Sequence, residues 1–201
     1  QAGEAARLYR VAFDKSPSTA LALRSFSAAF QAGDGVRGVA LLEGWLRRQP
    51  DALQVQAALA EGYLRLGRLE PARSTYEALL ARDPQNAAAA NNLAQVLMRL
   101  NDAGALAMAE KAARLAPADA NALDTLGWLQ ARSGALDIGL KTLRAARLRA
   151  PDSREVRYHL AWALHRSGKR DEARNELAAA LRARGEFESQ ADAEALRREL
   201  G

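Results

Sequence analysis

Residues 59–84, LAEGYLRLGRLEPARSTYEALLARDP, show the recurring pattern of this chain most clearly. Leu59 and Tyr63 are large apolar residues four positions apart, a spacing that places both on one face of a helix. Gly67 interrupts this helical pattern, a second one follows, and Pro84 ends it. Gly tolerates the left-handed conformation past a helix end, and Pro stops a helix because it lacks an N–H and clashes with the preceding turn. The stretch therefore predicts a helix, a tight turn, a second helix and a stop.

The same pattern recurs along the whole chain. Five of the six prolines are almost evenly spaced, and these are Pro17, Pro50, Pro84, Pro117 and Pro151. Each period also contains an inner break with Gly or Asn, at 32–35, 66–69, 100–103, 133–136 and 167–170. A period of this length is typical of stacked helical repeats.

Small residues recur in register with these breaks. They stand early in the second helices (Gly38, Ala72, Ala105, Gly139 and Ala173) and midway through the first helices (Ala60, Ala94, Gly127 and Ala161). Small side chains let two paired helices approach closely, so we expect tight helix pairs.

We predict an all-α fold, a right-handed superhelical solenoid of antiparallel helix pairs. Ala, Leu and Arg dominate the composition, which favours helices over strands. The predicted parts of this single solenoid domain are a second helix of a truncated repeat at 1–17, repeats at 18–51, 52–85, 86–118, 119–152 and 153–185, and a capping helix at 186–201. The repeat at 18–51 departs from the pattern, because Ser25 and Phe26 stand where Leu followed by Gly or Ala is expected.

The composition excludes several classes of site. The 201 residues contain no Cys, which rules out disulfides, thiolate metal sites and cysteine nucleophiles. The net charge of +5 comes from dispersed arginines without a basic run, so we expect no binding to nucleic acid. No apolar run is long enough to span a membrane. Because the chain begins at Gln1 without Met, we expect a fragment of a longer protein from which any targeting signal is missing.

Residues 158–168, YHLAWALHRSG, hold both histidines of the chain. His159 and His165 are six positions apart, about 240° around a helix, so they cannot grip one metal ion from the same helix. The chain has no Gly-x-Ser-x-Gly nucleophile motif. We therefore expect no enzyme activity, no metal and no cofactor, and we interpret both histidines as groove or surface polar residues.

The pattern of a Leu-Gly/Ala pair, a large residue, a small residue and a closing Pro resembles the tetratricopeptide repeat (TPR). Residues 59–84 and residues 125–151, TLGWLQARSGALDIGLKTLRAARLRAP, match nearly every position of that repeat. The resemblance implies a concave groove, lined by the first helices, that binds peptides or extended protein segments.

Two sets of equivalent residues fall at positions that the resemblance assigns to the groove. Trp128 and Trp162 stand at the same position of neighbouring repeats, and arginines recur at Arg65, Arg99, Arg132 and Arg166. Trp and Arg are enriched at binding hot spots. The predicted partner-binding residues are Asn91, Asn92, Gln95, Arg99, Asp124, Trp128, Arg132, Tyr158, His159, Trp162 and Arg166.

Structural alternatives exist for both sets. The arginines lie near predicted helix C-termini, where the helix dipole stabilises cations. The Trp128–Trp162 pair could instead pack between neighbouring repeats. Trp45 is outside the groove positions, and we predict that it belongs to the core of a second helix.

The C-terminal region resembles a bacterial group, the PEP-CTERM system TPR-repeat lipoproteins. The resemblance rests on residues 100–128, LNDAGALAMAEKAARLAPADANALDTLGW, and on 139–177, GLKTLRAARLRAPDSREVRYHLAWALHRSGKRDEARNEL. It implies a lipid-anchored parent in the bacterial periplasm or envelope, with a role in exopolysaccharide assembly or export or in sorting PEP-CTERM proteins. We therefore predict a non-catalytic scaffold that binds a protein or peptide segment. The alternative is an acidic polysaccharide, with Trp faces stacking on sugars and Arg pairing with carboxylates.

Overall fold

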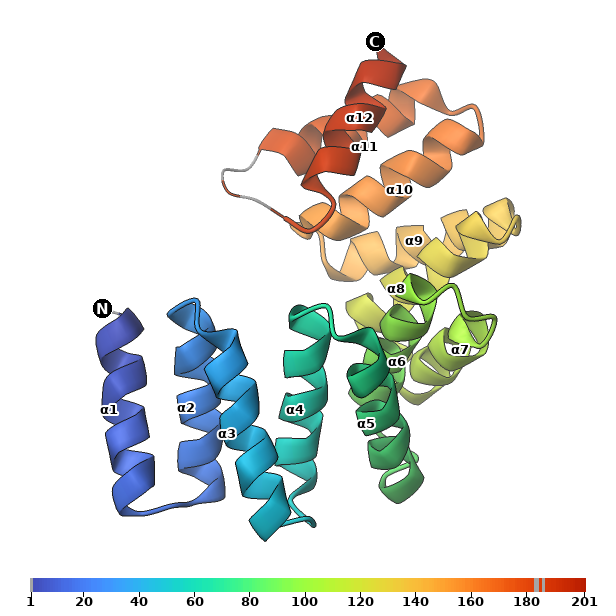
Figure 1. Cartoon of the computed structure of the whole chain (residues 1–201). Helices are drawn as coiled ribbons and strands as arrows, with labels where there is room; N and C mark the ends of the chain where they lie inside the picture. Colours follow the sequence, from blue (N-terminus) through green and yellow to red (C-terminus); the bar gives the residue numbers. More distant parts are fainter. Residues whose placement is uncertain (1, 183–184, 186) are drawn as a thin grey trace. The chain divides into compact units, whose positions relative to one another are not determined.

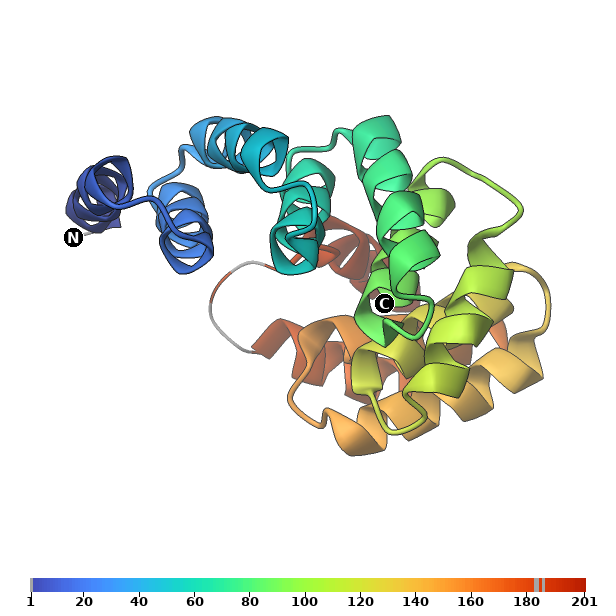
Figure 2. The ribbon, with the colours of Figure 1, turned by 90° about the horizontal axis from the view of Figure 1, so that it is seen from below.

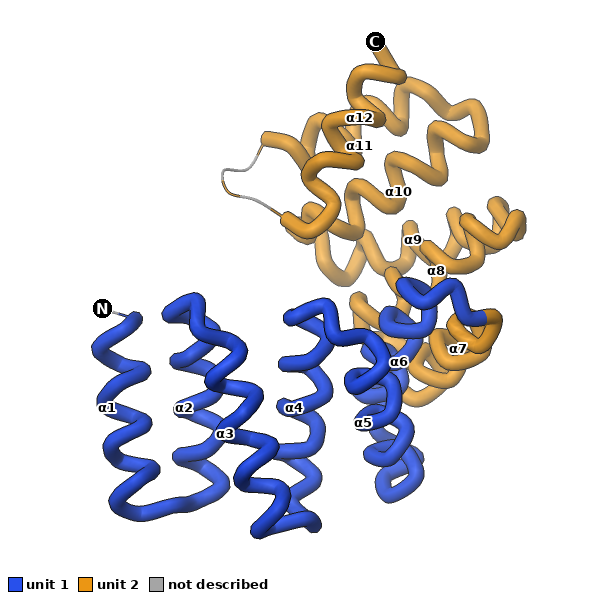
Figure 3. Tube along the Cα trace, in the orientation of Figure 1, with its two compact units in different colours: residues 1–102 blue, residues 103–201 orange. Residues whose placement is uncertain are grey.

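The computed structural model describes residues 2–182, 185 and 187–201 (Figure 1). This part of the chain forms twelve α-helices and no strand. It divides into two compact units, residues 1–102 and 103–201 (Figure 3). The division falls inside the repeat predicted at 86–118, and the repeat boundaries stay a prediction.

Unit 1 holds six helices. They are α1 (Ala2–Lys15), α2 (Thr19–Gln31), α3 (Gly35–Arg48), α4 (Leu53–Arg65), α5 (Leu69–Arg82) and α6 (Ala87–Arg99). Figure 2 looks nearly along the axes of α1, α2 and α3, and α2 packs against both of the others. Helix α4 also contacts α2 and α6, so α2 and α4 each meet the next first helix as well as their own partners, α3 and α5.

Unit 2 repeats this arrangement. Its helices are α7 (Ala105–Leu115), α8 (Ala120–Arg132), α9 (Leu136–Arg149), α10 (Arg154–Arg166), α11 (Arg170–Arg182) and α12 (Gln190–Leu200). Helix α10 packs against α8, α9, α11 and α12. The prediction of an all-α array of helix pairs is confirmed.

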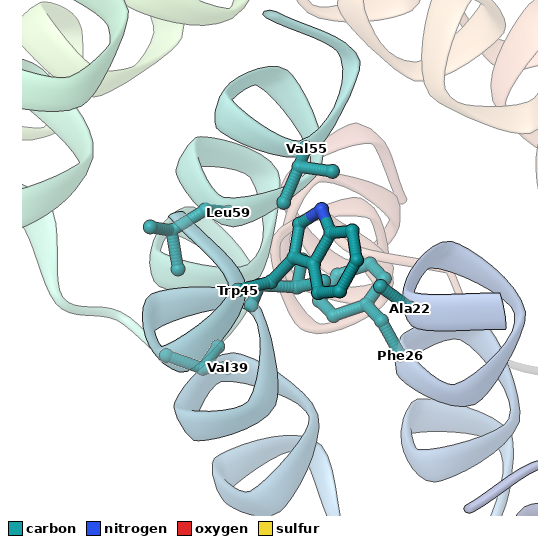
Figure 4. Packing of buried hydrophobic residues seen from close by; sticks show 7 residues of the cluster. Ala22, Phe26, Val39, Trp45, Val55 and Leu59 are labelled. Carbon is teal, nitrogen blue, oxygen red and sulfur yellow. The ribbon is translucent and has the colours of Figure 1, made fainter. Parts of the chain in front are cut away.

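The core of unit 1 surrounds an indole. Trp45 is 8% exposed and belongs to a buried cluster with residues of α2, α3 and α4. Figure 4 shows Phe26 and Val55 beside its ring. Phe13 of α1 adds an edge-to-face contact with ring centroids 5.5 Å apart. The prediction that Trp45 is a core residue of a second helix is confirmed.

The inner turns have the backbone that the Gly and Asn pattern predicts. Gly33, Gly67, Gly134 and Gly168 have φ angles of 79°, 70°, 95° and 79°, and Asn101 has a φ of 55° at the equivalent position. This left-handed region is open to Gly and tolerated by Asn. The predicted breaks between paired helices are therefore confirmed by their dihedral angles.

The predicted close approach of paired helices is seen between α8 and α9. A Cβ atom at Gly139 would lie 2.6 Å from the backbone N of Ala131 and 2.8 Å from the carbonyl O of Gly127. A Cβ atom at Gly127 would lie 2.8 Å from Cγ of Leu143. Two glycines thus face each other where the backbones of α8 and α9 are nearly in contact.

Candidate functional site

The residues predicted for the groove lie on three first helices. Helix α6 of unit 1 carries Asn91, Asn92, Gln95 and Arg99. Helices α8 and α10 of unit 2 carry Asp124, Trp128, Arg132, Tyr158, His159, Trp162 and Arg166. The α8 and α10 residues form one connected set of contacts.

Four rings of α8 and α10 form what we term the aromatic cluster: Trp128, Tyr158, His159 and Trp162. The Trp128 ring stacks on His159 with centroids 4.3 Å apart and an interplanar angle of 16°. It meets Trp162 edge to face at 4.9 Å and 75°, and Tyr158 at 6.0 Å. Aromatic pairs of this kind add about 0.5–1.5 kcal/mol beyond the area that they bury.

The two tryptophans have different exposures. Trp128 is 9% exposed and is enclosed by α10, so it packs between neighbouring first helices. Trp162 is only half-buried. The interpretation that these residues pack between repeats therefore fits Trp128, whereas the half-buried Trp162 leaves part of its ring available to a partner.

His159 is held by a buried carboxylate. Its Nδ1 lies 2.9 Å from Oδ2 and 3.0 Å from Oδ1 of Asp124, and each residue is 8% exposed. A carboxylate only accepts hydrogen bonds, so Nδ1–H donates to Asp124 and the ring plane is fixed against Trp128. The interpretation of His159 as a groove or surface polar residue is thus corrected, because its ring is buried and paired. His165 is half-buried, with Nε2 3.7 Å from Glu199.

Two residues outside the predicted set extend this polar chain. Nε2 of His159 lies 3.5 Å from Oε1 of Glu155, one turn earlier on α10. The hydroxyl of Ser189, just before α12, donates to the same carboxylate. Because Ser189 donates to Glu155 and not to His159, this is not the serine–histidine–aspartate arrangement of a hydrolase. The chain of contacts instead ties α8, α10 and the start of α12 together.

Burial also perturbs a phenol of the cluster. Tyr158 is 5% exposed, and burial raises its pKa to about 12, with smaller contributions from Asp192 and Glu155. Its hydroxyl therefore stays protonated near neutral pH.

The arginines at the ends of α8 and α10 lie over the tryptophans. The guanidinium carbon of Arg132 is 5.5 Å from the Trp128 ring centroid, and that of Arg166 is 5.7 Å from Trp162. Both arginines are exposed and are the last residues of their helices, where a cation is stabilised by the helix dipole. Stabilisation of Arg132 and Arg166 by the helix dipole is thus compatible with their predicted place in the groove.

The asparagines of α6 are engaged within unit 1. Asn92 donates from Nδ2 to the hydroxyl of Tyr76 at 3.0 Å. Asn91 is 6% exposed, and its Oδ1 has no hydrogen-bond partner within the described residues. Burial raises the pKa of Tyr76 to about 12, although the Asn92 hydrogen bond acts in the opposite direction. The amide groups of this pair are therefore less open to a ligand than the sequence pattern predicts.

Two kinds of feature are absent from the described residues. No group of three or more His, Cys, Asp or Glu side chains there could hold a metal ion. None of the helices described is both long enough and apolar enough to cross a membrane.

Comparison with known proteins agrees with this architecture. The tetratricopeptide repeat family model matches residues 53–96. No curated protein sequence matches the chain. A thermophilic TPR protein of Thermus thermophilus, TTC0263, is 24% identical over 89% of this chain and 96% of its own, with a TM-score of 0.71. The fold is a tetratricopeptide-repeat fold.

Two further solved structures share it. A tetratricopeptide repeat protein from Parabacteroides merdae has a TM-score of 0.78 and 17% identity, over 99% of this chain and 78% of its own. YrrB, described as a TPR protein with an unusual peptide-binding site, has a TM-score of 0.65 and 18% identity, over 97% of this chain and 100% of its own. At these identities the likeness concerns the fold alone.

Proposed function

We propose that this chain is a non-catalytic interaction module that binds an extended segment of a partner protein on the exposed side of the aromatic cluster. The observation that carries the proposal is the half-buried Trp162, which rests edge-on against the buried Trp128 and has Arg166 beside it. A rigid aromatic anchor next to exposed arginines is the composition of a protein-binding hot spot.

The cluster is ordered before any partner arrives. Trp128 cannot move without breaking its stack on His159, and Asp124 fixes that ring. A surface whose side chains are already fixed loses less conformational entropy on binding, which increases affinity. The peptide-binding site named for YrrB, which shares the fold, is further support for a peptide partner.

The cellular role that we propose rests on the sequence resemblance alone. The proposed role is in bacterial exopolysaccharide assembly or export or in PEP-CTERM protein sorting, with this chain as part of a lipid-anchored protein of the periplasm or envelope. Detecting the parent protein in membrane fractions of its source, before and after treatment that removes lipoproteins, would test this location. Recovery in the cytosolic fraction only would contradict it.

The binding site can be tested with peptides selected on the immobilised chain. Trp162→Ala should weaken a selected peptide by about 30-fold or more, since hot-spot truncations cost at least about 2 kcal/mol. Ile138→Ala, a truncation of another exposed apolar side chain of unit 2, is the matched control and should leave the affinity unchanged. Equal affinities for wild type and Trp162→Ala would refute the proposed site.

An acidic polysaccharide is the second candidate, because Arg132 and Arg166 flank an aromatic surface. An oligouronate binding wild-type protein with strong salt dependence, and binding an Arg132→Gln/Arg166→Gln variant much more weakly, would favour it. A salt-tolerant peptide complex that excludes the oligouronate would count against it.

A further inference from the structure

Each unit contains a cavity between one first helix and the two second helices beside it. In unit 1 a cavity of about 920 Å³ lies between α1, α2 and α3. In unit 2 a cavity of about 480 Å³ lies between α9, α10 and α11. The two cavities occupy the same place in the repeat, so their residues can be compared position by position.

Helix register defines the equivalent positions. The first residues of α1, α2 and α3 are aligned with the first residues of α9, α10 and α11, in that order. With this alignment, each of the eight residues that line the unit 2 cavity has its equivalent in the lining of the unit 1 cavity. The side chains at these eight equivalent positions can therefore be compared directly.

The floor of the unit 1 cavity has lost two large side chains. Leu160 and Leu164 line the smaller cavity and are 3% and 1% exposed. Their equivalents on α2 are Ser25 and Ala29. Ser25 is one of the two residues that depart from the repeat pattern, and the small side chains of Ser25 and Ala29 leave space that leucines occupy in unit 2.

The charges across the opening also change. In unit 2, Nη2 of Arg144 on α9 lies 2.8 Å from Oε2 of Glu172 on α11, and this ion pair bridges the cavity. The equivalent residues in unit 1 are Arg10 and Arg37. Two guanidinium groups cannot bridge the opening as an ion pair does, but an anion between them would be stabilised by both.

The lining of the unit 1 cavity carries a net positive charge. Five arginines and two aspartates line it, whereas two arginines and two glutamates line the unit 2 cavity. Within the described residues, the ion-pair partners of Arg10 and Arg37 lie on or beside their own helices, Asp14 at 3.9 Å and Asp34 at 3.2 Å. Arg7 is also paired, with Glu4 at 2.6 Å, so the remaining positive charge of the lining favours an acidic ligand.

The lining also contains two polar groups without a partner. Oγ of Ser25 and Nε1 of Trp45 form no hydrogen bond within the described residues, although these residues are only 4% and 8% exposed. A buried donor left unpaired is costly. Both atoms are themselves buried, so this cost belongs to the core of unit 1 and does not select a ligand.

The shape of the lining indicates a helical ligand. Lining residues run from Gly3 to Asp14 along α1 and from Asp34 to Arg48 along α3. At about 1.5 Å per residue these are lengths of about 16 and about 21 Å, which match a helix of three or four turns. Apolar side chains of Phe13, Leu41 and Trp45 lie within the same lining.

We propose that this space, the α1–α3 groove, binds an acidic amphipathic helix of a partner protein. The apolar face of that helix packs on Phe13, Leu41 and Trp45, and its carboxylates pair with Arg10 and Arg37. This is the helix-in-groove mode of peptide recognition. The proposal goes beyond the peptide site of unit 2, since it concerns other residues and stands if that site binds nothing.

The test uses the full chain and a fluorescein-labelled synthetic peptide of about 15 residues, a length that spans the groove. The peptide combines Leu and Ala on one face with Glu on the flanks, and a second peptide has Lys in place of Glu. Fluorescence anisotropy should show binding of the acidic peptide, weakened by salt, and no binding of the basic one.

Two variants connect binding to the groove. Arg37→Glu puts a carboxylate at the position equivalent to Glu172, and Ser25→Leu restores the side chain found at Leu160. Each should weaken the acidic peptide by about tenfold or more. Arg24→Gln removes an exposed arginine of α2 outside the lining and should change the affinity less than about twofold.

Several results would overturn the proposal. They are equal binding of both peptides and an unchanged affinity for the acidic peptide in Arg37→Glu. Binding of a fatty acid, dodecanoate, in the groove of a chain that does not bind the acidic peptide would also overturn it. If Ser25→Leu does not fold, as judged by circular dichroism, the substitution of the exposed Arg37 in Arg37→Glu still tests whether the acidic peptide binds in the groove. Retained peptide binding in Trp162→Ala would separate this groove from the site of unit 2.

Discussion

Substituting Gly139 tests how closely α8 and α9 pack. A methyl group at Gly139 would lie 2.6 Å from the backbone N of Ala131 and 2.8 Å from the carbonyl O of Gly127, where ordinary contacts begin near 3.4 Å. Both obstacles are backbone atoms, so the helices must separate by most of this shortfall. Overpacking of this kind costs up to about 3 kcal/mol, and the higher helix propensity of Ala returns about 1 kcal/mol. We expect Gly139→Ala to lower the free energy of unfolding by about 2 kcal/mol.

The assay is urea unfolding followed by far-ultraviolet circular dichroism. The matched control is Gly44→Ala in α3, where a methyl group would meet only the end of the Arg47 side chain at 3.6 Å. There the propensity term acts almost alone, and we expect stabilisation by up to about 1 kcal/mol. If Gly139→Ala proves neutral or stabilising, the inference that backbone contact holds α8 against α9 is wrong.

Three further predictions concern single residues. Asp124→Asn should lower the free energy of unfolding by about 1 kcal/mol, because a neutral amide oxygen is a weaker acceptor for Nδ1–H of His159 than the carboxylate; an unchanged thermal midpoint would contradict this. Stability should fall between about pH 10 and pH 12, since the folded pKa of Tyr76 is about 12 and the unfolded value is about 10. The stability that Tyr76 contributes is complete below the unfolded pKa and is lost as pH rises through the folded pKa. In urea titrations across this range, the free energy of unfolding of Tyr76→Phe should therefore fall less than that of wild type. An equal fall would refute the assignment to Tyr76. Asn101→Ala should cost about 1 kcal/mol at a φ of 55°, whereas Asn101→Gly should be neutral or stabilising; equal unfolding midpoints for the two variants would show that the turn is not strained.

Much of the fold could be predicted because its determinants are local. The Gly and Asn positions of the inner turns follow from backbone sterics alone, so Gly67 and Asn101 could be assigned the same turn from sequence. The close approach of α8 and α9 follows from Gly127 and Gly139, whose small size has few other uses inside a helix.

The candidate site was predictable only in part. Repeat register places Trp128 and Trp162 at equivalent positions on neighbouring first helices, which is why their contact follows from the sequence. Register does not give their exposures, because these depend on side-chain rotamers. Register also does not predict the Asp124–His159 pair. The position equivalent to Asp124 is residue 158 and not residue 159, so this contact runs diagonally between α8 and α10.

Other interactions depend on parts of the chain that carry no repeat signal. Ser189 meets Glu155 only because the segment before α12 returns to α10. Ser25 indicated an irregularity beside α1, but the volume and charge of the cavity there depend on three helices together. Sequence reasoning identified the unusual residue and could not predict the space that it leaves.

Helix α1 differs from the other helices in having no buried residue, and within unit 1 its backbone packs closely only against α2. Contacts between near neighbours make local opening possible without global unfolding. We therefore expect the amide hydrogens of α1 to exchange with solvent faster than those of α2 to α4. Since α1 forms one wall of the α1–α3 groove, every opening of α1 also dismantles that groove. A ligand that binds only the closed form would slow this exchange in proportion to the ratio of its concentration to its dissociation constant. The occupancy of the groove could then be measured from the hydrogen-exchange protection of α1 alone.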